Sequence, residues 1–263
     1  MEVFTPRSLD EALQIAADHP DARPIAGGTD MLVELNFDRA RPSALLNLNE
    51  VDELRGWSRE NGTVRLGAGL TYTEAMRAPL SELCPALAEA SRTVGSPQIR
   101  NRGTIGGNLG TASPAGDALP PLLVYAAEVE LRSAEGSRTV RLEEFLVGPK
   151  RNALAAGELV VGVRFRADGS PQTFMKVGPR NAMVIAVVSL AVAVDRDAGE
   201  LRAAYGSAGP VPALVSAPVE ERDSFAERVA AAASPIDDIR GTAAYRRHAL
   251  RVLTERALDR CLA

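Results

Sequence analysis

Residues 95–117 read GSPQIRNRGTIGGNLGTASPAGD, the most glycine-dense stretch of the chain, with hardly any regular periodicity. Four glycines fall within the eight residues 103–110. Successive glycine amides can form a concave anion site, and a purely structural loop rarely contains so many glycines, because ordering each one costs conformational entropy. Short polar side chains accompany them: Thr104, Asn108, Ser113 and Asp117. Asp117 is suited to accept a hydrogen bond from a ribose or an amine.

A second glycine loop, Gly27-Gly28-Thr29-Asp30, lies between an expected strand at 24–26 and an expected helix start at 31–35. Glycine lets a ligand approach the backbone closely, and a helix start offers unpaired N–H groups. Taken alone, the loop also fits a tight turn with Thr29 as the N-cap. The chain has neither a G-x-G-x-x-G pattern nor a phosphate-loop lysine. Together the two loops favour a diphosphate held by backbone amides, as in a bound dinucleotide such as FAD.

Composition excludes several other classes. The 263 residues are 46% apolar and carry a net charge of −4, typical of a soluble globular protein without the basic excess of a nucleic-acid binder. The longest apolar run, 182–194, is shorter than the roughly 20 residues of a membrane span, and the N-terminus has no signal-peptide pattern. We therefore expect a cytoplasmic protein.

The rare residue types point away from hydrolytic and metal chemistry. Cys84 and Cys261 are expected to be buried thiols rather than a disulfide. His19 and His248 are expected on the surface, and neither has a partner at metal-ligand spacing. We expect no catalytic side chain and no metal ligand in this chain.

The pattern of elements predicts an α+β fold with a junction at residues 167–171, which have loop composition. Ser8–Glu11 forms a capping box before an expected helix that Pro20 closes. Further helices are expected near 73–76, 85–94, 118–127, 221–232 and from 242. Strands are expected near 45–48, 64–68, 159–165, 173–177, 184–194 and 201–205, with a hairpin across 129–142.

At these motifs the sequence resembles the FAD-binding medium subunit of the molybdenum hydroxylases, the xanthine dehydrogenase and carbon monoxide dehydrogenase family. The resemblance covers nearly the whole chain. It rests on residues 24–30 (PIAGGTD), 95–108 (GSPQIRNRGTIGGN), 111–117 (TASPAGD), 174–176 (FMK) with Arg180, and 238–248 (DIRGTAAYRRH). Residues 95–108 are the most specific of these.

The resemblance implies a fold and a division into domains. An FAD-binding domain of two α+β lobes, similar to vanillyl-alcohol oxidase, would occupy residues 1–166. A small C-terminal domain at 171–263 would contain a three-stranded antiparallel sheet with helices.

The resemblance also implies the cofactor contacts. Non-covalent FAD would be held by Pro24, Ile25, Ala26, Gly27, Gly28, Thr29, Asp30, Met31, Val94, Thr104, Ile105, Gly106, Gly107, Asn108, Ser113, Asp117, Val160 and Lys176. In this assignment residues 24–31 and 104–108 hold the diphosphate, and Asp117 binds the nucleotide part. Read from the residues alone, without the family resemblance, Lys176 is expected to be a surface lysine on a strand.

The implied activity is electron transfer within an oxidoreductase complex. A large partner subunit would carry the molybdenum cofactor and a small one two [2Fe–2S] clusters, in a heterotrimer or its dimer. FAD in this chain would pass electrons to NAD or another acceptor. Relatives often have an acidic residue where this chain has Val184, which leaves the acceptor open, and the substrate is equally open. Two other readings remain: a stand-alone flavin oxidase of the vanillyl-alcohol oxidase type, and a non-catalytic scaffold that lost FAD.

Overall fold

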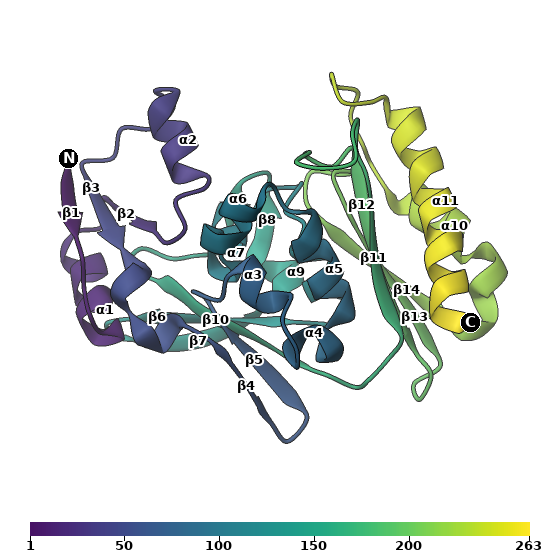
Figure 1. Ribbon diagram of the computed structural model, residues 1–263, viewed down its shortest axis with the longest axis horizontal. Coiled ribbons are helices and arrows are strands. Elements are labelled where there is room, and N and C mark those ends of the chain that lie inside the picture. Colours follow the sequence, from purple (N-terminus) through teal and green to yellow (C-terminus); the bar gives the residue numbers. More distant parts are fainter.

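The computed structural model describes residues 1–263 and contains three main sheets arranged in a row (Figure 1). The first sheet is parallel, in the order β1-β3-β2: β1 (Glu2–Phe4), β2 (Ala22–Ile25) and β3 (Ala44–Asn47). Helix α1 (Leu9–Asp18) connects β1 to β2. Its apolar positions, at helical spacing, bury Leu9, Ala12, Leu13 and Ala16. The Ser8 hydroxyl caps it by accepting a hydrogen bond from the Glu11 amide, as the sequence predicted.

The second sheet has five strands in the order β4-β5-β10-β6-β7, and all its pairs are antiparallel. Its strands are β4 (Trp57–Glu60), β5 (Thr63–Gly67), β6 (Glu128–Ser133), β7 (Gly136–Arg141) and β10 (Leu159–Arg166). The expected hairpin is therefore β6–β7. Helices fill the segments between these strands: α3 (Tyr72–Ala75), α4 (Leu80–Leu83), α5 (Pro85–Thr93), α6 (Pro97–Arg102), α7 (Ile105–Thr111), α8 (Leu119–Val124) and α9 (Leu142–Phe145). A small ribbon, β8 (Leu146–Gly148) with β9 (Arg151–Asn152), follows α9.

The third sheet corrects one expectation, because it has four antiparallel strands and not three. They are β11 (Gln172–Val177), β12 (Val188–Asp195), β13 (Glu200–Gly206) and β14 (Ala213–Pro218). The sequence analysis missed β14, since Gly209, Pro210 and Pro212 precede it and Pro218 ends it, which gives the segment the composition of a loop. Helices α10 (Arg222–Ala232) and α11 (Ala243–Leu262) cover the outer face of this sheet (Figure 1).

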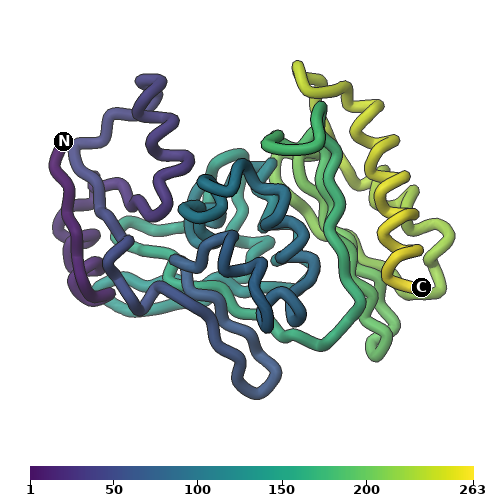
Figure 2. The backbone as a smooth tube through the Cα atoms, viewed as in Figure 1, coloured from purple at the N-terminus to yellow at the C-terminus, as the bar shows by residue number.

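Two apolar clusters hold these layers together. The larger lies in the first two sheets and their helices, around Phe145, and the smaller lies between the third sheet and its outer helices, around Phe225. Phe174 of β11 belongs to the larger cluster, because α5 packs on β11 and α8 on β12 and β13. The two ends of the chain lie at opposite ends of the row (Figure 2).

Other sequence expectations can be compared directly with the structure. Cys84 and Cys261 are buried free thiols, and His19 and His248 are exposed, as predicted. Residues 95–117, expected to lack regular structure, contain the short helices α6 and α7. None of the helices combines the length and apolarity that crossing a membrane would require.

Candidate functional site

The main cavity of the molecule has a volume of about 400 Å³, and both glycine loops line it. It lies where the β2–α2 loop, with helix α2 (Met31–Asn36), meets α7 and the β8–β9 ribbon. Its volume is within the range of about 300–1,000 Å³ that small-molecule and cofactor sites occupy. Segments far apart in sequence therefore converge on one cavity.

The first glycine loop offers free hydrogen-bond donors to this cavity. The amides of residues 27–30 donate no hydrogen bond to any backbone or side-chain group of the chain. Gly27 is required by close packing, since a Cβ there would lie 2.0 Å from the Arg102 carbonyl oxygen. Gly28 has φ of +76°, a left-handed conformation that glycine adopts without strain. Four consecutive unpaired amides are the donors an anionic group needs.

The second loop differs from the expected nest of free amides. The amides of Ile105, Gly106 and Asn108 donate to Leu70 O, Ala68 O and Thr104 O, and that of Gly107 to the Thr104 hydroxyl. Gly106 is instead required by packing, because a Cβ there would lie 2.5 Å from the Ala68 Cβ. The glycines here let α7 approach the end of β5 and so form one wall of the cavity.

Thirteen of the eighteen residues assigned from the sequence line this cavity. They are Pro24, Ile25, Ala26, Gly27, Gly28, Thr29, Asp30, Met31, Thr104, Gly106, Gly107, Asn108 and Val160. The remaining five do not line it: Val94, Ile105, Ser113, Asp117 and Lys176. Ile105 is fully buried in the larger apolar cluster.

Asp117 and Lys176 contact each other. The Lys176 ammonium lies 2.6 Å from Asp117 Oδ2, and the two side chains are 6% and 7% exposed. Burial raises the pKa of Asp117 despite the opposing attraction of Lys176. Asp117 Oδ1 is buried without a partner. The pair joins the start of α8 to β11, so it connects the second and third sheets.

Sequence reasoning missed several charged and polar residues of the cavity wall. Lys150 and Glu34 form an ion pair of 3.0 Å, and Arg23 lines the wall nearby. Glu158 accepts two hydrogen bonds from Arg138, which, with a further bond from the Ala155 amide, hold its pKa below the usual range although partial burial opposes this. No local motif marks these residues, because they come together only through the tertiary fold.

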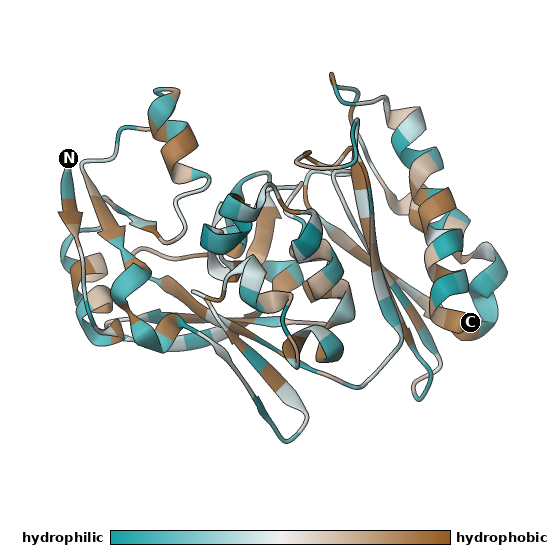
Figure 3. Ribbon diagram, viewed as in Figure 1, coloured by the Kyte–Doolittle hydropathy of each residue, from teal (hydrophilic) through white to brown (hydrophobic).

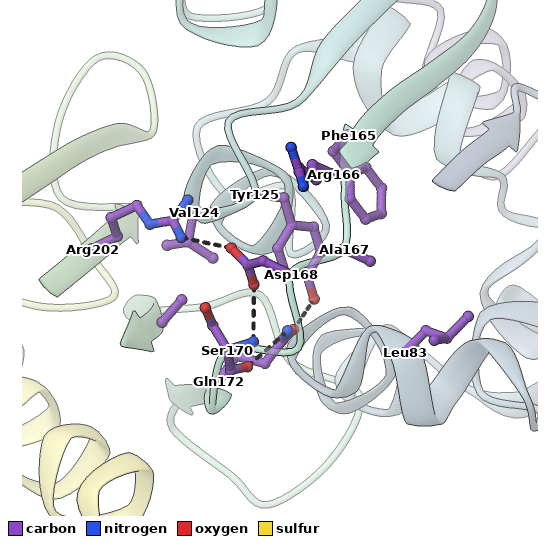
Figure 4. A pocket seen from close by; sticks show the side chains of 11 residues that line it. Leu83, Val124, Tyr125, Phe165, Arg166, Ala167, Asp168, Ser170, Gln172 and Arg202 are labelled. Atoms are coloured by element: carbon purple, nitrogen blue, oxygen red, sulfur yellow. Dashed lines mark hydrogen bonds and ion pairs between the residues drawn. The ribbon is translucent and has the colours of Figure 1, made fainter. Parts of the chain in front are cut away.

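A second, much smaller cavity of about 10 Å³ lies at the junction of the second and third sheets (Figure 4). Arg202 contacts Asp168 at 3.1 Å there, and Tyr125 donates a hydrogen bond to Gln172. The space holds about one water molecule. Its polar side chains mostly have partners within the chain, which marks it as a structural junction.

Comparison with known proteins gives consistent matches to one kind of subunit. The family described as the FAD binding domain in molybdopterin dehydrogenase matches residues 1–165. The nicotinate dehydrogenase FAD-subunit of Eubacterium barkeri is 38% identical over 75% of this chain and 70% of its own length. The xanthine dehydrogenase FAD-binding subunit of Escherichia coli O157:H7 is 29% identical over 97% of this chain and 94% of its own length.

Solved structures agree with these sequence matches. A chain of carbon monoxide dehydrogenase from Hydrogenophaga pseudoflava superposes with a TM-score of 0.91 at 28% identity, covering all of this chain and 97% of that one. The likeness therefore extends beyond residues 1–165 and includes the third sheet and its helices.

Proposed function

Since this chain belongs to the family of FAD-binding domains of molybdopterin dehydrogenases, we propose that it is the electron-transfer subunit of a molybdenum hydroxylase. It is a flavoprotein and an oxidoreductase subunit. In our proposal it takes electrons from the [2Fe–2S] clusters of a small partner and passes them to NAD or another acceptor. A large partner would hold the molybdenum cofactor and oxidise the substrate.

The residues of the main cavity fit FAD. The observation that carries the proposal is the run of four unpaired amides at residues 27–30. They can donate to the diphosphate, and Arg23 lines the same cavity, whereas the charge of Lys150 is paired with that of Glu34. No histidine or cysteine lines the cavity, which argues against the covalently tethered flavin of a stand-alone oxidase.

The chain's own residues bind and orient the cofactor in this proposal. When bound, FAD supplies the redox chemistry, and the protein supplies position and electrostatics. Residues 24–31 would hold the diphosphate against the wall formed by Thr104, Gly107 and Asn108. Val160 would pack against the cofactor from β10. No side chain of this chain need donate or remove a proton.

Asp117 and Lys176 are assigned to the nucleotide-binding set only if the cofactor reaches the junction of the second and third sheets. This contact requires Asp117 Oδ1, which is enclosed and has no partner within the chain, to become exposed to the cofactor. Val94 and Ser113 would contact the cofactor from the same side. Val184, in place of a common acidic residue, packs against Gly178 and carries no charge, and the proposal leaves the electron acceptor open.

The same proposal covers the organisation of the complex. The FAD-binding domain would span residues 1–166 as two lobes, in the manner of vanillyl-alcohol oxidase, and the C-terminal domain would span 171–263. The chain would assemble in the cytoplasm as a heterotrimer or its dimer. Similar chains are named for nicotinate, xanthine and carbon monoxide dehydrogenases. In this proposal the large subunit, and not this chain, therefore selects the substrate.

The first test is the visible absorption of the purified chain and of its acid-released supernatant. We expect a flavin spectrum, and FAD in the supernatant. Gly107→Asp should abolish flavin retention, because Gly107 lines the cavity, its Cβ would lie 3.0 Å from the Thr104 hydroxyl, and a carboxylate there would repel the diphosphate.

Gly136→Asp is the matched control, since Gly136 lies in the exposed β6–β7 hairpin with no atom near a Cβ. It should keep full flavin. A wild-type chain that stays colourless with added FAD would favour a non-catalytic scaffold that lost FAD. Full flavin retention by Gly107→Asp would contradict the assignment of the FAD site to this cavity.

A further inference from the structure

Tyr72, the first residue of α3, lines the main cavity although the sequence gives no reason to select it. The residue is 5% exposed, so its ring is held by the protein. Its hydroxyl makes no hydrogen bond within the chain, and it is not among the fully enclosed polar atoms that lack a partner. The open space it can reach is therefore the cavity. A buried side chain with a free donor directed into a cavity is typical of a ligand contact.

The ring lies where the two glycine loops meet. The Tyr72 amide donates to the Gly103 carbonyl at 3.1 Å, and a Cβ on Gly103 would lie 3.0 Å from the Tyr72 ring. A Cβ on Gly27 would lie 2.9 Å from the Gly103 nitrogen. Tyr72 is thus next to the loop that carries the unpaired amides at 27–30.

The phenol stays protonated in this position. Burial, and then the charges of Asp117 and Asp30, raise the pKa of Tyr72 well above its usual value. A hydroxyl that keeps its proton is a permanent donor. A neutral donor also suits a wall that contains the carboxylates of Asp30 and Glu34, since it adds no further repulsion to an anion.

We propose that Tyr72 is a further cofactor-binding residue, whose hydroxyl donates a hydrogen bond to a phosphate oxygen of the FAD diphosphate. This inference rests on the proposed function. It adds the Tyr72 hydroxyl, a side-chain donor, to the backbone amide donors of residues 27–30. The capping box between Thr71 and Glu74, with a 2.8 Å bond from the Thr71 amide, fixes the start of α3 and hence the position of the ring.

The test is Tyr72→Phe in the full chain stripped of flavin, with binding of FAD, ADP and riboflavin measured by titration. Loss of one hydrogen bond to a charged group should weaken FAD and ADP about tenfold each. Riboflavin, which lacks phosphate, should bind equally to both proteins. The melting temperature of the apoprotein should not fall, because the hydroxyl has no partner within the chain.

Tyr125→Phe is the matched control. The Tyr125 hydroxyl donates to Gln172 (Figure 4) and accepts from the Leu87 amide, and Tyr125 does not line the main cavity. This variant should lose stability and keep its FAD affinity. Equal FAD affinity of wild type and Tyr72→Phe would overturn the inference while leaving the proposed function intact. Weaker FAD with unchanged ADP would also overturn it, and a wild type that binds neither ligand would overturn both.

Discussion

The Asp238–Arg246 pair explains why a charged motif sits near the C-terminus. The Arg246 side chain is 3% exposed and donates to Val187 O at 2.8 Å, to Ser207 O at 2.6 Å and to Asp238. Asp238→Asn leaves this guanidinium without a counter-charge. We expect a loss of about 3 kcal/mol in the free energy of unfolding, at the low end for a broken buried pair, because Asp238 is partly exposed. Denaturant titration at pH 7 measures it, with Asp237→Asn as the neighbouring control.

The same pair should make the free energy of unfolding depend on pH. Burial would raise the pKa of Asp238, but the hydrogen bond from the Arg240 amide and the bond and charge of Arg246 outweigh it and lower the pKa. A lowered pKa stabilises the fold above the unfolded value of about 3.9, and this stabilisation is lost as pH falls through the folded pKa. The stability gap between wild type and Asp238→Asn should therefore shrink below about pH 4. A constant gap would contradict the assignment.

At this scale, the sequence predicted where the glycines gather but only part of their role. Glycine at 27, 28 and 107 was read as access for a ligand, and all three line the cavity, although Gly27 is also required by packing against Arg102. Glycine at 106 serves packing against Ala68, a contact with no trace in the local sequence. Tyr72 was missed because a single tyrosine has no motif, and only the fold brings it to the cavity.

Among the elements that line the cavity, α2 is weakly anchored. None of its residues is buried, and its short ribbon includes hydrophobic residues (Figure 3). Leu32 and Val33 are exposed. Six residues are too few for a stable isolated helix. The cross-cavity contacts of this segment are the Lys150–Glu34 ion pair and the 3.1 Å bond from Thr111 to Asp30. The position of α2 over the cavity therefore depends on contacts to the end of α7 and to the β8–β9 turn.

Glu34→Gln should loosen α2. An exposed ion pair contributes about 0.2–1 kcal/mol, so amide hydrogen exchange in residues 31–36 should quicken up to about fivefold. Hydrogen-exchange mass spectrometry of the apoprotein measures this, and Lys150→Met should give the same change. Glu60→Gln, at the exposed end of β4, is the control. Unchanged exchange in both variants would mean that the ion pair does not hold α2.

The elements that sequence analysis predicted well are those with strong local signals. Helix α1 has a capping box and an apolar face, and the β6–β7 hairpin alternates on both sides of a turn. Helices α6 and α7 give weaker signals, since α6 buries none of its residues and α7, which buries only Ile105 and Leu109, contains three glycines. Strand β14 is flanked by prolines. These three depend on tertiary contacts, which override local propensity.

In the whole molecule, polar contacts tie the third sheet to the helices of the second. Glu89 of α5 accepts hydrogen bonds from the Thr173 hydroxyl at 2.8 Å and from the Phe174 amide at 2.7 Å. The Asp117–Lys176 pair lies in the same interface, and Phe174 is buried in the larger apolar cluster. Because the two clusters share these contacts, we expect the apoprotein to unfold in a single cooperative transition.

Asp117→Leu tests this coupling, since it leaves the Lys176 ammonium buried with the Thr93 carbonyl, 3.4 Å away, as its remaining partner. A buried charge without its partner costs about 3–5 kcal/mol, and Lys176→Met added to Asp117→Leu should recover most of that loss. Denaturant unfolding of the apoprotein measures both the loss and its recovery. Because no FAD is present, contacts between the pair and the cofactor do not affect the result. Hydrogen exchange should rise in both the second and the third sheet, because one transition unfolds both. Faster exchange confined to residues 172–263 would show instead that the C-terminal sheet unfolds on its own.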